Sequence, residues 1–193
     1  QATSFNNAGN ITLSDGSSTA AVTAGGDLSS HNLENVTLTL NASSTLPDST
    51  ADLPAKLLAG SNAITANATV DVSNVTITNL GSVSVANSIT FSISAAQATT
   101  KTITTSGSGN IAVTSLHSTP AANLSGLSSS SGTVTAAFDG NATFTGTLGN
   151  AVVTVADSVT MTAAYSVLNG KTANHDGSES GQALVVLLPA ASA

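Results

Sequence analysis

Three histidines are the side chains best suited to acid–base or metal chemistry in this 193-residue chain, and they lie far apart. His31, His117 and His175 show none of the close pairing that marks a zinc site. Cysteine is absent, so thiolate metal sites and disulfides are both ruled out. The sequence therefore predicts no metal centre.

Serine is abundant enough to leave a Ser/His/Asp triad open, but the sequence carries no nucleophile elbow. The segment "GSESG" has Glu179 at its centre, where that motif requires a serine. Glu34 and Glu179 are the only glutamates, and no glycine-rich loop has the lysine and helix of a phosphate site. We therefore expect no catalytic residue, no enzymatic activity and no cofactor other than covalent glycans.

Two further arrangements could do chemistry. Asp176 and Glu179 offer carboxylate oxygens to Ca²⁺, but their spacing fits no calcium loop, and a solvated loop is the favoured interpretation. Lys101 is the best-placed lysine for an intramolecular Lys–Asn crosslink, which needs a buried lysine beside an asparagine and an acid.

The charge pattern excludes one class of partner. Ten scattered acids, three lysines and no arginine give a formal charge of −7, so phosphate groups cannot be neutralised and no nucleic-acid partner is expected. The longest apolar run, "ALVVLLPAA", is about half of a membrane span. We expect no membrane span in the mature chain and interpret Gln1 as the start of a processed chain.

Glycan acceptor triplets are the remaining motif. About five would arise by chance in a chain so rich in Asn, Ser and Thr, so number alone is weak support for glycosylation. Several of them fall on the polar side of alternating segments, which favours N-glycans there. The seven predicted glycosylation sites are Asn10, Asn35, Asn41, Asn67, Asn74, Asn123 and Asn141.

Alternating segments are expected to position these sites. In "NATVDVSNVTITN" (67–79), Val70 and Val72 share one parity, and the apolar parity switches at Ser73–Asn74. Period-2 alternation predicts half-buried strands, and the switch predicts a bulge or a tight turn. Similar segments recur along the chain at the spacing of a sandwich or barrel, on the order of 11 to 13 strands.

We therefore predict an all-β protein with a jelly-roll-like or Ig-like β-sandwich. "TVTAAFDGNATFTGTL" (133–148) predicts a hairpin that turns at Asp139–Gly140, and the continuously apolar "ALVVLLPA" predicts a central strand covered on both faces. One short helix is expected at about 54–59, with Asp52 as its cap. No repeat of fixed period is found.

The N-terminus has a different pattern. Residues 1–14 predict an extended strand with Phe5, Ile11 and Leu13 in one apolar phase, and residues 15–26 predict a flexible tether. Residues 27–193 would form the sandwich body.

These features together resemble the subunits of archaeal thread filaments and, more distantly, archaeal bundling pili and bacterial biofilm-matrix fibres. The resemblance lies in composition, sequons and the tethered strand over the whole chain, and in no diagnostic motif. It implies a jelly-roll-like subunit that donates a terminal strand to its neighbour and carries many N-glycans. It also implies that Phe5, Ile11 and Leu13 are donor side chains.

The function expected from this resemblance is structural. We predict a subunit of an extracellular, cell-surface filament that assembles head to tail with identical subunits, for adhesion or biofilm formation. The alternatives are a monomeric surface adhesin or carbohydrate-binding sandwich, and an S-layer component. Few exposed aromatics are available for a sugar platform, since the chain has one Tyr, four Phe and no Trp.

Overall fold

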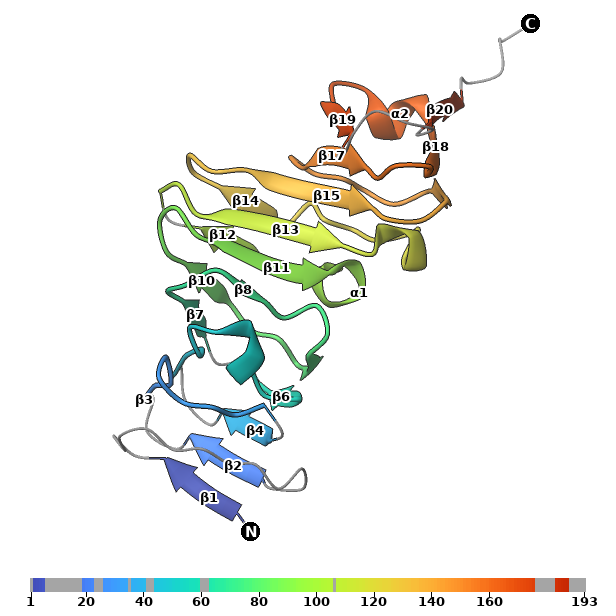
Figure 1. The fold of residues 1–193 in the computed structure, drawn as a ribbon. Coiled ribbons are helices and arrows are strands. Elements are labelled where there is room, and N and C mark those ends of the chain that lie inside the picture. Colours follow the sequence, from blue (N-terminus) through green and yellow to red (C-terminus); the bar gives the residue numbers. More distant parts are fainter. Residues whose placement is uncertain are drawn as a thin grey trace, which may run out of the picture.

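The computed structural model of this chain is an elongated stack of coils (Figure 1). It describes residues 2–5, 19–22, 26–34, 36–40, 44–59, 63–105, 107–175 and 183–187. Within these ranges, twenty strands form four sheets, and every strand pair is parallel. A chain that returns to the same place and direction after each coil is a β-solenoid.

The predicted jelly-roll-like or Ig-like sandwich is therefore wrong, although the expected strand-rich composition is correct. A sandwich packs two antiparallel sheets face to face. In the solenoid, each strand instead pairs with its counterpart in the next coil, and the rest of the coil serves as the crossover that parallel pairing requires.

The coils have three faces. The first face contains β3 (Gly26–Asp27), β5 (Ser44–Thr45), β7 (Ile64–Ala66), β10 (Val83–Val85), β12 (Ile103–Thr105) and β14 (Leu127–Ser129). The second face contains β8 (Val70–Asp71), β11 (Thr90–Ser94), β13 (Asn110–Thr114), β15 (Val134–Phe138), β17 (Val152–Val155) and β19 (Ala173–His175).

The third face is built from two sheets with short helices between them. Its N-terminal sheet contains β1 (Ala2–Phe5), β2 (Thr19–Val22), β4 (Thr37–Leu40), β6 (Lys56–Leu58) and β9 (Thr76–Thr78). Helices α1 (Ala95–Ala98) and η2 (Leu116–Ser118) follow, and then comes a sheet of β16 (Ala142–Phe144), β18 (Thr160–Ala164) and β20 (Ala183–Leu187). The other short helices are η1 (Thr50–Asp52) and α2 (Tyr165–Leu168).

The coils differ in length, which explains why no fixed period is visible in the sequence. Val83 pairs with Ile103, 20 residues further on, whereas Ile103 pairs with Leu127, 24 residues further on. On the second face, Ala136 pairs with Val153, only 17 residues further on. Insertions at the corners lengthen a coil without disturbing the pairing of its strands.

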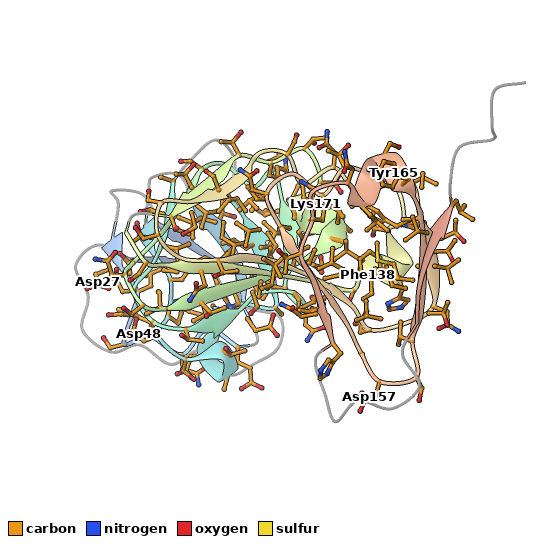
Figure 2. All side chains as sticks on the ribbon, turned by 90° about the horizontal axis from the view of Figure 1, so that it is seen from above. Asp27, Asp48, Phe138, Asp157, Tyr165 and Lys171 are labelled. Carbon is orange, nitrogen blue, oxygen red and sulfur yellow. The ribbon has the colours of Figure 1, made fainter. Side chains whose placement is uncertain are left out.

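The core runs along the axis of the stack. Inward-facing side chains of successive coils lie in register, as Phe91, Ile111 and Val134 do, and all three are buried. Phe138 and Phe144 pack edge to face with ring centroids 5.4 Å apart. Figure 2 shows Phe138 inside the coils, while Asp27 and Asp157 lie at the periphery.

A strand–turn–strand–helix–strand motif occurs twice, 70 positions apart. The first copy is Val83–Thr105 and the second copy is Val153–His175. Both turns contain a serine with positive φ (Ser88, 62°; Ser158, 61°), and both motifs carry a four-residue helix followed by Lys-Thr. The first copy uses the first and second faces, whereas the second copy uses the second and third faces.

The helix predicted at about 54–59 is also wrong. Lys56–Leu58 is strand β6, and Asp52 ends η1 instead of capping a helix. Within β6, Leu57 is buried and Lys56 is exposed, so the segment fits a strand with one face on the core.

Two strand assignments are corrected as well. The predicted hairpin at Asp139–Gly140 is a corner of the solenoid, because β15 and β16 lie on different faces and do not pair. The apolar segment near the C-terminus is not a central strand, since β20 pairs with β18 alone among the described strands. Leu184 to Leu187 are all exposed.

Candidate functional site

The described residues contain one serine–histidine–aspartate cluster, at the corner where η2 meets the end of β15. With Nδ1 of His117 protonated, the ring donates to Asp139 Oδ1 at 2.6 Å and accepts from the Ser118 hydroxyl through Nε2 at 2.8 Å. Ser115 also donates to the Asp139 carboxylate, at 3.4 Å. The His117 and Asp139 side chains are 38% and 46% exposed.

This cluster has the order of contacts found in a catalytic triad, but the backbone N–H groups of Ser118 and of the next residue have other partners. Backbone N–H groups beside the nucleophile are a common source of the donors that stabilise an oxyanion in acyl transfer. The N–H of Ser118 donates to Ser115 O and that of Thr119 to Leu116 O, so neither is free for this task. Both hydrogen bonds close the turn of η2. The arrangement ties η2 to the following corner, and a Cβ at Gly140 would lie 2.8 Å from His117 Cγ.

The sequence left a Ser/His/Asp triad open but gave no reason to assign His117 to one or to connect it with Asp139. The two residues are 22 positions apart, which is about one coil. Once the coil length is known, residues one coil apart become candidates for contact. No local motif carries that information.

Metal ligands do not converge in the part of the chain that the structure describes. No group of three or more His, Asp or Glu side chains could hold an ion there. His31 is buried and His175 is exposed on β19, far from each other along the stack. Asp176 and Glu179, the two carboxylates of the calcium alternative, lie outside the described residues.

The sequon asparagines are found on the outside of the coils wherever the structure describes them. Asn67, Asn74 and Asn141 are exposed, and Asn123 is half-buried. The other three predicted sites, Asn10, Asn35 and Asn41, lie outside the described residues.

Two of these asparagines also accept hydrogen bonds from backbone N–H groups. Asn141 Oδ1 accepts from Thr160 N at 2.7 Å, and Asn123 Oδ1 accepts from Ser125 N at 3.1 Å. An N-glycan is attached through Nδ2, so both bonds to Oδ1 are compatible with a sugar. Asn141 also borders a surface hollow of about 340 Å³ lined mainly by threonines of β16 and β18.

The predicted donor strand is part of the solenoid where it is described. Phe5 belongs to β1, which pairs in parallel with β2 of the same chain. Strand β2 falls within the segment predicted as a tether, and Ile11 and Leu13 lie outside the described residues.

The two ends of the stack are the other candidate site. Among the described strands, β1 pairs only with β2 and β20 only with β18, so each has one edge without a strand partner. Figure 1 places these strands at opposite ends of the molecule. Four consecutive apolar side chains of β20 are exposed: Leu184 (41%), Val185 (40%), Val186 (40%) and Leu187 (50%).

No helix among the described residues combines the length and apolar character needed to cross a membrane. The chain matches no family model, no curated protein and no solved structure.

Proposed function

We propose that this chain is a structural subunit of an extracellular, cell-surface filament in which identical molecules are joined head to tail. The observation that carries this proposal is a parallel solenoid with a strand edge at each end. Exposed strand edges promote association with other chains, and apolar side chains strengthen the tendency. A contact between two different ends of identical molecules does not close on itself and therefore produces a linear polymer.

The surface chemistry supports a structural role outside the cell. Only 7% of the residues are charged, and the exposed sequon asparagines Asn67, Asn74 and Asn141 could carry the sugars that solvate such a surface. The similarity of composition to thread subunits points the same way. Insertion of an N-terminal strand between two sheets has no counterpart in a solenoid, so the joint must differ from the one that the resemblance implies.

Electron microscopy and sedimentation of the purified chain at increasing concentration test the proposal. Filaments one solenoid wide, lengthening with concentration, are expected. A chain that stays monomeric at high concentration, with and without its glycans, would contradict the filament. Glycopeptide mass spectrometry of native material should find sugar on Asn67, Asn74 and Asn141.

One observation favours a second candidate, a monomeric surface adhesin that binds carbohydrate. Outward-facing hydroxyl residues follow one another in register along the first face: Thr45, Thr65, Ser84, Thr104 and Ser128. Hydroxyl groups at the 4.7–4.9 Å spacing of neighbouring strands could contact successive sugars of a polysaccharide. Binding to a glycan array by a protein that remains monomeric would favour this candidate over the filament.

A further inference from the structure

We propose that β20 of one molecule pairs in parallel with β1 of the next, so that the third face continues without interruption from one subunit into the following one. This inference rests on the proposed filament, because it specifies the joint by which the filament would be built.

The first support is that β1 and β20 are the two ends of the same face. From β8 onward the chain passes from each second-face strand directly to an element of the third face, and successive elements of that face contact one another. Gln97 of α1 donates through Nε2 to Val75 O, immediately before β9, at 2.6 Å. Helix α1 contacts η2, and η2 contacts β16. The third face is therefore one continuous column from β1 to β20.

The second support is direction. β1 pairs in parallel with β2, and β18 pairs in parallel with β20. A second molecule stacked with the same polarity presents its β1 in the direction that β20 requires. A two-fold dimer joined end to end would bring antiparallel strands together and would close, so it would not use the pairing found throughout this fold.

The third support is that residues in core positions are exposed to solvent on β20. Phe144 is in register with Ala163, and Ala163 with Val186. The first two are buried, but Val186 is 40% exposed although it occupies the same inward position. Leu184 extends the line of Met161 in the same way, and it is 41% exposed. These side chains have the positions of core residues, and no further coil of the described chain covers them.

The outward positions of β20 are apolar too. Side chains alternate between the two faces of a strand, so Val185 and Leu187 lie opposite Leu184 and Val186. On β18 the residues paired with Val185 and Leu187 are Thr162 and Ala164, which are small. A strand with large apolar side chains in both phases is suited to being covered on both sides, which a neighbouring subunit would achieve.

Disulfide trapping tests the pairing directly, because the native chain has no cysteine. Cα atoms of paired residues on neighbouring strands are within disulfide range. Four double variants combine Thr3→Cys or Ser4→Cys in β1 with Val185→Cys or Val186→Cys in β20. At least one should give a ladder of covalent dimers, trimers and longer species on non-reducing gels under assembly conditions. The control Ser4→Cys/Ser84→Cys, with its second cysteine exposed on β10, should give none.

A charge variant tests the apolar contact. Val186→Lys should raise the concentration needed for assembly by about tenfold or more, because a lysine on a strand edge opposes pairing. Ser84→Lys adds the same charge at an exposed site in the middle of the first face and should leave assembly unchanged. Circular dichroism of both variants checks that the fold is retained.

The outcomes separate this inference from the proposed function. Normal filaments with no ladder from any double variant, and with Val186→Lys assembling like the native chain, would overturn the joint and leave the filament standing. Loss of assembly in Val186→Lys without any ladder would assign β20 to the interface but exclude β1. Failure of the native chain to assemble would remove both proposals.

Discussion

The two copies of the repeated motif follow the same local path but differ in the burial of their helix and last strand. In the first copy, Ala95 and Ala98 of α1 are buried, as are Ile103 and Thr105 of β12. In the second copy, α2 has no buried residue, and all three residues of β19 are exposed. The first copy has coils on both sides, whereas the second lies in the last coils that the structure describes (Figure 1).

The helices of the two copies differ in their hydrogen bonds. Ser94 and Gln97 form a capping box on α1, and Gln97 Nε2 also donates to the carbonyl oxygens of Val72 and Val75 in the preceding coil. Helix α2 begins at Tyr165, and its N-cap residue, Ala164, provides no side-chain cap. Local residues thus set the path of the chain, and contacts with the neighbouring coil decide which residues are buried and bonded.

The largest expected effect comes from exchanging residues at one pair of equivalent positions. Ile103→Ala gives the first copy the residue found in the second and should lower the free energy of unfolding by about 2–5 kcal/mol, because it leaves a cavity in the core. The reverse change, Ala173→Ile, is at an exposed site and should alter it by less than about 0.5 kcal/mol. Urea denaturation measures both, and equal losses would mean that the copies do not differ in environment.

Removing the hydrogen bonds between Gln97 and the preceding coil should lower the free energy of unfolding by a smaller amount. Gln97→Ala removes the Gln97 half of the capping box, in which Oε1 accepts from Ser94 N, and leaves the carbonyl oxygens of Val72 and Val75 without this donor, so a loss of about 1–3 kcal/mol is expected. The matched change in the second copy, Val167→Ala, removes a half-buried side chain and should cost at most about 1 kcal/mol. If the two variants melt at the same temperature, Gln97 does not hold the coils together.

The second residue after each helix gives a smaller effect, of opposite sign in the two copies. Thr100 and Gly170 both have positive φ, 62° and 71°. Gly170→Thr should destabilise the fold by about 1–2 kcal/mol, because a residue with a Cβ is strained in that conformation. Thr100→Gly relieves the strain but gives the unfolded chain more freedom, so a net gain below about 1 kcal/mol is expected. Thermal unfolding of both variants provides the comparison.

The smallest expected effect comes from Asp27, which lies outside both copies of the motif and serves as a control. The backbone N–H of Ser29 donates to the Asp27 carboxylate at 3.0 Å and, together with the Ser29 hydroxyl, lowers the pKa of Asp27 below its usual value. A pKa that is lower in the folded state stabilises the protein at pH values above the usual pKa, and this contribution is lost as the pH falls below that value and through the lowered pKa.

Asp27→Asn should therefore lower the melting temperature slightly at about pH 7, and the difference from the native chain should vanish once the pH falls below the lowered pKa of Asp27. The contrast between Ile103→Ala and Ala173→Ile should be unchanged by this substitution. A difference between Asp27→Asn and the native chain that persists in acid would assign the effect to something other than the carboxylate charge.

Much of the local structure could be predicted from alternation. Val83 and Val85 are buried on either side of the exposed Ser84, as a half-buried strand requires. The switch of parity at Ser73–Asn74 is confirmed as a turn, and it separates β8 on the second face from β9 on the third. Of the candidate site, the exposure of Asn67, Asn74 and Asn141 agrees with their placement on polar positions, whereas the contact of His117 with Asp139 had no local signal.

The sequence by itself determined which residues lie inward along alternating strands such as Val83–Val85, and turns such as the one at Ser73–Asn74, because both depend on side chains within a few positions of each other. Only the tertiary structure decided that the strands pair in parallel between coils. Alternation of apolar and polar residues is usual for antiparallel sheets with one solvent-exposed face. Each face of a solenoid is also buried on one side only, so alternation does not distinguish the two folds. The length of the coils could not be inferred from the sequence either, because a coil can have any length that brings the next strand into register. Extra residues are accommodated at the corners, as between Ile103 and Leu127. The exposure of β20 has the same cause: its apolar residues favour burial, but no further coil of the described chain lies beyond it.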